Sequence, residues 1–256
     1  MTIYTALTNV LRLKNSRVRA LTILNTQDDT EEFPDVETAL EEPDGLLAVG
    51  GCLSPKRLEN AYRHGIFPWY NENEPILWWS PNPRLILKPE KLIISRSLRK
   101  VIRKKNFQVS FDVAFEDVLD SCAGYRHGIN GTWITQEMKN AYLNMHRIGL
   151  AHSVECWHQQ RLVGGLYGVA IGRVFYGESM FFRCSNASKV AFVRLVELLR
   201  AWGYTLIDCQ MQTQHLMNFG AENIPRNEFI QLLVVNCDIP PLEMAWKTFD
   251  LEVDTK

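Results

Sequence analysis

The sequence lacks the features that most often reveal a cofactor or a membrane segment. No apolar run approaches the roughly 20 residues that a helix needs to cross a bilayer. The six cysteines lie at least 25 positions apart without a C-x-x-C pair, and the six histidines form no H-E-x-x-H motif. No P-loop or G-x-G-x-x-G pattern opens a helix, so metal, ATP and NAD sites find no support. Scattered single cysteines are typical of reduced thiols in the cytosol.

Charge is unevenly distributed near the N-terminus. Residues 1–20 contain four basic residues and no acid, but they lack the apolar core and cleavage site of a secretory signal. We interpret residues 1–32 as an N-terminal extension that is poorly ordered at its start, and residues 241–256 as a polar tail. Between Asp28 and Asp44 there are nine acids and no Lys or Arg, which predicts a solvated loop or short helix.

The stretch from His152 to Lys189 predicts a β-meander. Three strands are expected over 153–158, 162–171 and 174–181, with a tight hairpin between the last two. Glu178 falls in the third, otherwise apolar strand, where a carboxylate needs a partner. It is either a functional carboxylate or an ordinary buried acid paired with an arginine such as Arg183.

A second candidate edge follows the meander. An amphipathic helix is expected over 187–202, followed by a buried strand over 204–210. Period-2 alternation in that strand puts Asp208 and Gln210 on one face and Cys209 on the other. The carboxylate and amide together form a candidate catalytic edge, while Cys209 is expected to pack in the core.

Basic and aromatic residues suggest a nucleic-acid partner. Residues 84–105 contain nine Lys or Arg and only one acid, and Ser95 caps a helix within them. Such single-sign crowding favours phosphate binding over an ordinary solvated face. The helix carries Arg96, Arg99, Lys100, Arg103 and Lys104. The aromatics between 67 and 79 suit either a small core or base stacking.

Other chemistries fit these residues less well. A serine hydrolase needs G-x-S-x-G, but the segment 177–181 is GESMF and lacks the second glycine. A thiol enzyme needs a paired cysteine and histidine, and the sequence shows no good candidate for such a pair. The order of meander, helix, strand and helix is typical of a GCN5-related N-acetyltransferase (GNAT) core. The family's glycine-containing pyrophosphate loop is missing at 183–188, which argues against acyl-CoA.

Several long motifs occur in one order over roughly residues 33–230. They are EPDGLLAVGG, AYRHGIFPW, ILWWSPNPR, GTWIT, AHSVE, LVGGLYG, GESMF, NASK and IDCQ. On these motifs the chain resembles the bacterial leucyl/phenylalanyl-tRNA–protein transferases. The resemblance implies an α+β fold, with a small N-terminal α/β domain over 33–85 and a GNAT-like catalytic domain over 86–240.

The resemblance also implies an activity. Members move Leu or Phe, and less readily Met, from aminoacyl-tRNA to the α-amino group of proteins that begin with Arg or Lys. The product is marked for N-degron proteolysis. Aminolysis of an ester is downhill, so neither a cofactor nor a metal is expected. We expect a cytoplasmic monomer without a membrane partner.

The motif positions assign roles to particular residues. The apolar pocket for the transferred side chain maps to Leu166, Phe175, Phe192 and Ile207, and the aromatics that hold the terminal adenosine map to Trp69 and Trp133. The basic helix is expected to grip the acceptor stem.

For the chemistry, we expect Asp208 to polarise Gln210, whose amide oxygen accepts a hydrogen from the attacking amine. A ribose hydroxyl of the tRNA is the alternative proton relay. Glu178 is expected to hold a cationic or amine group of a substrate. Two other classes stay open: a GNAT-like enzyme that uses acyl-CoA, and a non-catalytic RNA-binding module, which the acidic residues argue against.

Overall fold

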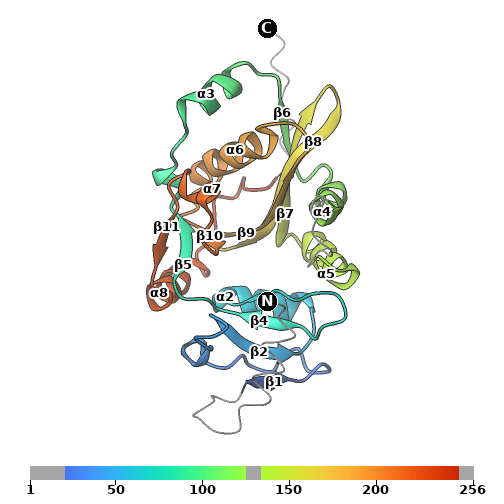
Figure 1. Cartoon of the computed structure of the whole chain (residues 1–256), viewed down its shortest axis with the longest axis vertical. Helices are drawn as coiled ribbons and strands as arrows, with labels where there is room; N and C mark the ends of the chain where they lie inside the picture. The colour runs from blue at the N-terminus through green and yellow to red at the C-terminus, as the bar shows by residue number, and fades with distance from the viewer. Residues whose placement is uncertain (1–20, 125–133, 248–256) are drawn as a thin grey trace.

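A computed structural model describes residues 21–124 and 134–247 (Figure 1). They form two β-sheets, one above the other in this view. The smaller sheet contains four strands in the order β1-β2-β4-β3. Their bounds are β1 Thr22–Leu24, β2 Leu46–Gly50, β3 Phe67–Pro68 and β4 Leu77–Trp79.

Helix α2 (Pro55–Arg63) lies between this sheet and the rest of the molecule. It begins after Ser54, because the Ser54 side chain accepts a hydrogen bond from the Arg57 amide and proline occupies the first turn. It ends before Gly65, whose φ of +72° suits glycine. A side chain at Gly65 would collide with Ile230, so the glycine also permits close packing.

The larger sheet contains seven strands in the order β11-β5-β10-β9-β8-β7-β6. Strands β7, β8 and β9 form the predicted antiparallel meander. Strands β9 and β10 are parallel, and α6 connects them. The strand bounds are β5 Arg84–Leu87, β6 Gln108–Phe111, β7 Ala151–His158, β8 Arg161–Ile171, β9 Val174–Phe182, β10 Leu206–Gln210 and β11 Glu222–Ile224.

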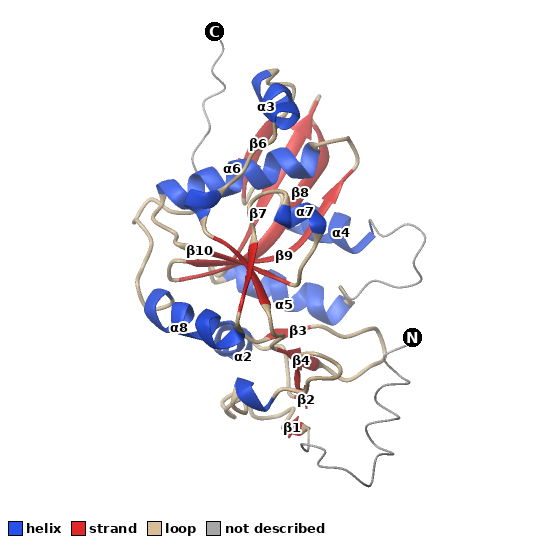
Figure 2. Cartoon of the chain, turned by 60° about the vertical axis from the view of Figure 1, so that its left-hand side comes forward, coloured by secondary structure: helices blue, strands red, loops and turns tan. Residues whose placement is uncertain are grey.

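Helices cover both faces of the larger sheet (Figures 1 and 2). The glycines of β8 allow this close approach: a side chain at Gly164 would meet Ala187 of α6, and one at Gly165 would meet Val118 of α4. These glycines therefore make room for protein packing. The helices are α3 Arg96–Arg103, α4 Phe115–Gly124, α5 Gln136–Arg147, α6 Ala187–Ala201, α7 Gln214–Met217 and α8 Arg226–Asn236, with 3₁₀ turns η1 Val36–Thr38 and η2 Pro89–Lys91.

Both terminal segments contribute more structure than the sequence suggests. Residues 22–24, which we assigned to the extension, form strand β1 and pair in parallel with β2. In the tail, Trp246 stacks on His152 at 3.9 Å between ring centroids, and its indole N–H donates to the Tyr204 hydroxyl. Residues 1–20 and 248–256 lie outside the described part.

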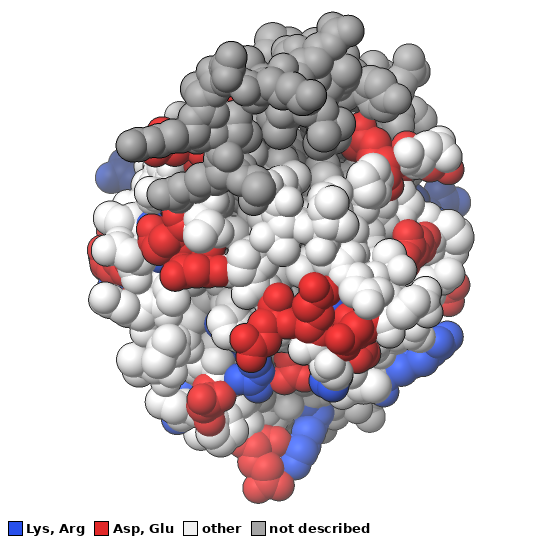
Figure 3. Space-filling model, turned by 90° about the horizontal axis from the view of Figure 1, so that it is seen from below, with Lys and Arg blue, Asp and Glu red and all other residues white. Residues whose placement is uncertain are grey.

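The acidic segment that begins at Asp28 is mainly irregular, apart from η1. Acidic side chains gather on the lower end of the molecule (Figure 3). Among the helices of the described ranges, none is long and apolar enough to span a membrane.

Candidate active site

A cavity of about 400 Å³ opens where β9 and β10 separate. Their parallel pairing runs from Leu206 opposite Val174 to Asp208 opposite Tyr176 and then ends. Because both strands point the same way, their last side chains meet at one edge of the sheet. Glu178 of β9 and Gln210 of β10 lie just beyond the last pair, so the separation of the strands positions both at the cavity.

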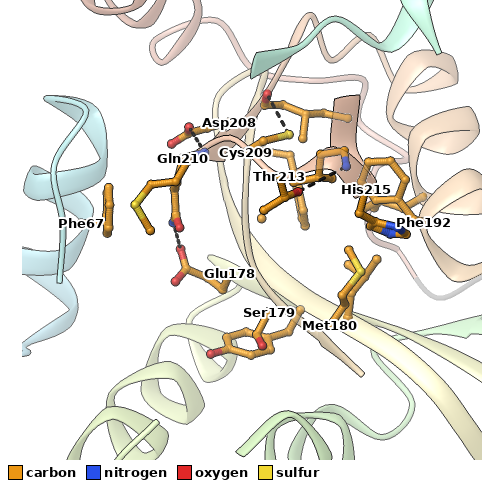
Figure 4. A pocket seen from close by; sticks show the side chains of 18 of the residues that line it. Phe67, Glu178, Ser179, Met180, Phe192, Asp208, Cys209, Gln210, Thr213 and His215 are labelled. Atoms are coloured by element: carbon orange, nitrogen blue, oxygen red, sulfur yellow. Dashed lines mark hydrogen bonds between the residues drawn. The ribbon is translucent and has the colours of Figure 1, made fainter. Parts of the chain in front are cut away.

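The cavity has an apolar end and a polar end (Figure 4). Phe192, Met180 and His215 lie at one side, and Glu178 and Gln210 lie at the other, near Phe67. The residues expected to bind the transferred side chain all line this cavity: Leu166, Phe175, Phe192 and Ile207. The residues expected at the reacting edge, Glu178, Asp208 and Gln210, line it too.

Glu178 is surrounded by neutral hydrogen-bond donors. The Tyr62 hydroxyl donates to its Oε1 atom at 2.8 Å, and the Tyr142 hydroxyl donates to its Oε2 atom at 2.7 Å. Gln210 Nε2 adds a third donor at 3.2 Å. Burial raises the pKa of Glu178 to about 7, although the two tyrosine hydrogen bonds oppose the shift. The pairing with Arg183 that we considered is wrong, because Arg183 donates to Ser121 and to the Leu162 carbonyl.

Asp208 has a different partner from the one expected. It is completely buried, and both of its oxygens accept hydrogen bonds from the Arg84 guanidinium, at 2.8 and 2.6 Å. Its Oδ1 atom also accepts from the Gln210 main-chain N–H at 2.9 Å. The carboxylate therefore contacts the main chain of Gln210 and not its side-chain amide, so the expected polarisation of that amide is absent.

A β-bulge interrupts the strand pairing at the end of β10. The register against β5 shifts between Asp208 and Gln210, and Gln210 adopts a φ of +61°. The predicted alternation nevertheless holds for the side chains, since Asp208 and Gln210 bind Arg84 and Glu178, whereas Cys209 packs against the apolar cluster that contains Ile207. All three residues line the cavity. Burial raises the pKa of the Cys209 thiol, which keeps it protonated near neutral pH and weakens it as a nucleophile.

Of the clustered aromatics, most belong to the protein interior. Trp78 and Trp79 are buried, and the indole N–H of each donates to a main-chain carbonyl. Half-buried Trp69 lines the cavity and packs against Trp79. Trp133, the second residue expected to stack on adenosine, lies outside the described residues.

Helix α3 presents an exposed basic surface. Leu98 anchors it in the core near α6. The expected phosphate ligands Arg96, Arg99, Lys100, Arg103 and Lys104 are all exposed. None of them joins an ion pair with an acid in the two described ranges.

Sequence reasoning missed the residues that support the polar end. Tyr62 and Tyr142 look like core residues of their helices, and Arg84 looks like one more member of the basic run. A usable signal exists, because a carboxylate in an apolar strand needs donors and buried tyrosines need partners. In the described part of the chain, no cluster of His, Cys, Asp or Glu is arranged to hold a metal ion.

The parallel β9–α6–β10 unit beside an antiparallel meander, with a cavity where the strands part, defines a GNAT-like acyltransferase fold. Solved structures that the chain resembles include FemX, at 11% identity and a TM-score of 0.43, covering 69% of this chain and 70% of that one. Another is a GCN5-related N-acetyltransferase from Kribbella flavida, at 14% identity and a TM-score of 0.33, covering 64% and 58%.

Residues 86–234 match the model of the leucyl/phenylalanyl-tRNA protein transferase family, and residues 51–82 match the model of its N-terminal domain. A relative with the name leucyl/phenylalanyl-tRNA–protein transferase from Stutzerimonas stutzeri is 58% identical over 212 residues, 83% of this chain and 94% of the relative. One from Azotobacter vinelandii is 58% identical over 214 residues, 84% and 95% of the two chains. The chain belongs to this family and is an aminoacyltransferase.

Proposed function

We propose that this enzyme transfers Leu, Phe and less readily Met from aminoacyl-tRNA to the α-amino group of proteins that begin with Arg or Lys. The products are then marked for N-degron proteolysis in the cytoplasm. The observation that carries the proposal is the two-ended cavity, which joins an apolar pocket to a carboxylate held by neutral donors. Cys52, Cys156, Cys184, Cys209 and Cys237 are free thiols, which agrees with a reducing compartment.

The apolar end suits the transferred side chain. Buried Leu166, Phe175 and Ile207 supply apolar walls, and Phe192 of α6 closes one side. We assign Trp69, together with Trp133, to stacking on the terminal adenine. The adenine at the end of a tRNA is unpaired, so its face is free to stack on an aromatic side chain. We assign the exposed cations of α3 to the phosphates of the acceptor stem.

The polar end suits the attacking amine. Within the described residues, Glu178 accepts hydrogen bonds from three neutral donors and forms no ion pair, so an ammonium group of the acceptor would complete its surroundings. Gln210 donates through Nε2 to Glu178, and we assign its Oε1 atom to an N–H of the amine.

The chemistry needs a neutral amine at the ester carbonyl. Its nitrogen forms the new C–N bond, the ester C–O bond breaks, and the ribose oxygen leaves as a hydroxyl after taking one proton. The other proton of the original ammonium passes to Glu178 or, through the ribose hydroxyl, to solvent. Positioning of the amine supplies most of the rate, because an amide such as Gln210 is a very weak base.

A direct assay tests the proposal. The enzyme is incubated with Phe-tRNA and matched peptides that begin with Arg, Lys, Asp or Ala, and the products are read by mass spectrometry. A Phe-Arg or Phe-Lys product, with little product from the Asp and Ala peptides, is expected. Equal transfer to all four peptides would overturn the acceptor assignment, and binding of acetyl-CoA with acetyl transfer would favour the acyl-CoA alternative.

A further inference from the structure

Arg84 lies at the junction of three parts of the molecule. It is the first residue of β5, and its guanidinium lies between the ring of Phe67 on β3, at 4.8 Å, and the ring of Phe229 on α8, at 4.7 Å. Its Nε and Nη2 atoms bind the two oxygens of Asp208 in the bidentate geometry that arginine favours. The side chain is 1% exposed.

Stability alone is a poor explanation for this ion pair. A buried pair stabilises a fold little more than well-packed apolar residues of similar volume do, since both charges lose their hydration. Among the described residues the guanidinium is not fully satisfied either, because the buried Arg84 Nη1 atom has no hydrogen-bond partner there. Because burial of this ion pair costs desolvation free energy that packing alone does not require, we look for a further role of Arg84.

The ion pair connects directly to the polar end of the cavity. Asp208 uses Oδ1 both for Arg84 and for the main-chain N–H of Gln210. That hydrogen bond lies at the bulge where Gln210 adopts a positive φ, a conformation that a residue with a Cβ atom adopts only when its surroundings enforce it. The bulge in turn brings Gln210 Nε2 to 3.2 Å from Glu178.

We propose that Arg84 is a positioning residue for the reaction: it fixes Asp208 so that Asp208 holds the Gln210 bulge and aims the Gln210 amide at Glu178 and the attacking amine. Asp208 acts as the link in this chain and not as a base. Phe67 lies on the guanidinium and also lines the cavity, so the smaller sheet contributes to the same alignment. The inference rests on the proposed role of Gln210 and Glu178.

The test compares single-turnover transfer from preloaded Phe-tRNA to an Arg-initiated peptide, together with Phe-tRNA affinity and thermal unfolding. The variants are Arg84→Met, Arg84→Lys, Asp208→Asn and the double variant Arg84→Met/Asp208→Leu. Gln210→Ala tests the polar end itself. Arg57→Met is the matched control, because Arg57 is equally buried beneath an aromatic ring, Phe33, but lies on α2 and donates to the main-chain carbonyls of Asp28 and Glu31.

Arg84→Met and Asp208→Asn are expected to lower the single-turnover rate by about 10- to 100-fold with Phe-tRNA affinity within about twofold, because small misplacements of reacting groups cost this much. Arg84→Lys keeps the positive charge but lacks the planar guanidinium, so its single-turnover rate should lie between the rates of these two variants and the rate of the native enzyme. The double variant should regain thermal stability without regaining rate. Arg57→Met should lose stability and keep its rate per folded molecule.

Native-like transfer by the double variant would overturn the inference, since the pair would then serve folding alone. If Arg84→Met does not fold, the transfer rates of the double variant and of Arg84→Lys still test whether Arg84 positions Gln210. If Gln210→Ala slows transfer and the folded Arg84 variants do not, only the inference about Arg84 fails. If Gln210→Ala also transfers at the native rate, the proposed role of the polar end fails with it.

Discussion

The hydroxyl oxygens of Tyr62 and Tyr142 lie 2.7 Å apart, and each is also hydrogen-bonded to a different oxygen of Glu178. The two phenols supply two protons for these three oxygen–oxygen contacts. When Glu178 is ionised, one contact lacks a proton, whereas a protonated carboxyl supplies the third. The hydrogen bonds that the two phenols donate to Glu178 lower its pKa and so oppose burial, the main cause of the raised pKa.

The first prediction concerns pH. If transfer needs ionised Glu178, the single-turnover rate should fall as the pH falls through about 7. The hydrogen bond from Tyr142 lowers the pKa of Glu178, so Tyr142→Phe should raise that pKa and move the acidic limb to higher pH. The charges of Asp208, which raises the pKa, and Arg84, which lowers it, remain in this variant.

The measurement is the pH profile of single-turnover transfer with Phe-tRNA. Tyr204→Phe is the control, because Tyr204 is also buried and hydrogen-bonded but contacts Trp246 instead of Glu178. An acidic limb at the same pH in native enzyme and Tyr142→Phe would show that Glu178 ionisation does not govern the rate.

The second prediction concerns stability. Because the pKa of Glu178 is raised from 4.5 to about 7, the folded protein keeps this proton at a pH where the unfolded chain has lost it. The native protein therefore loses stability as the pH rises from about 4.5 to about 7. Glu178→Gln imitates the neutral acid and should be more stable above pH 7 by about 2–3 kcal/mol, after allowance for partial exposure.

Urea unfolding of the native enzyme and Glu178→Gln between pH 4 and 8 measures this difference. The two free energies of unfolding should agree near pH 4 and separate with rising pH. Equal stability at pH 8 would mean that Glu178 is solvated well enough to ionise at its ordinary pKa. The same variant should transfer slowly, which is the familiar conflict between stability and activity at a functional site.

The sequence predicts the regular parts of this molecule better than its polar contacts. Hydrophobic periodicity and the turn at 172–173 correctly indicate the meander and helix α6, because burial of their apolar faces depends on local pattern. The apolar residues assigned to one pocket also meet at one cavity.

What the sequence could not predict depends on contacts between distant residues. Tyr62 and Tyr142 are 80 positions apart, and Tyr62 and Glu178 are 116 apart, so no local pattern pairs them. The bulge after Asp208 adjoins an ion pair between that carboxylate and Arg84, 124 positions earlier. Period-2 alternation correctly separates Cys209 from Asp208 and Gln210, but it does not predict the bulge or the positive φ of Gln210.

The third prediction concerns tRNA binding by α3. Reversal of two of its exposed cations, as in Arg99→Glu/Arg103→Glu, should weaken aminoacyl-tRNA binding and flatten its salt dependence. The slope should change by about 0.7–0.9 log unit per log salt for each phosphate that the variant no longer neutralises. Lys56→Glu, an exposed cation on α2, is the control. A salt slope equal to that of the native enzyme would remove α3 from the interface.

The fourth prediction concerns the choice of amino acid. An apolar pocket separates ligands that differ by one methylene by only about 1–3 kcal/mol, so leakage to Met is expected. Exclusion of the β-branched Ile and Val must come from the shape set by Phe175 and Phe192. Competition among Phe-, Leu-, Met-, Ile- and Val-tRNA measures these ratios. Phe192→Ala should reduce the ratio of Leu transfer to Val transfer. Efficient transfer of Val by the native enzyme would contradict the proposal that this pocket excludes β-branched side chains.

The last prediction separates Cys209 from its neighbour Gln210. Cys209 lines the cavity, but burial raises its thiol pKa, so almost no thiolate exists near neutral pH to attack the ester. Cys209→Ala should therefore keep the single-turnover rate and lose about 1 kcal/mol of stability from a small truncation. Gln210→Ala should slow the same step while Phe-tRNA affinity stays nearly native.

If Cys209→Ala instead abolished the chemical step in a folded protein, and acid quenching trapped a phenylalanyl thioester on the native enzyme, transfer would proceed through a thiol-acyl intermediate. Direct attack by the amine would then be wrong, and Gln210 would serve only to shape the bulge.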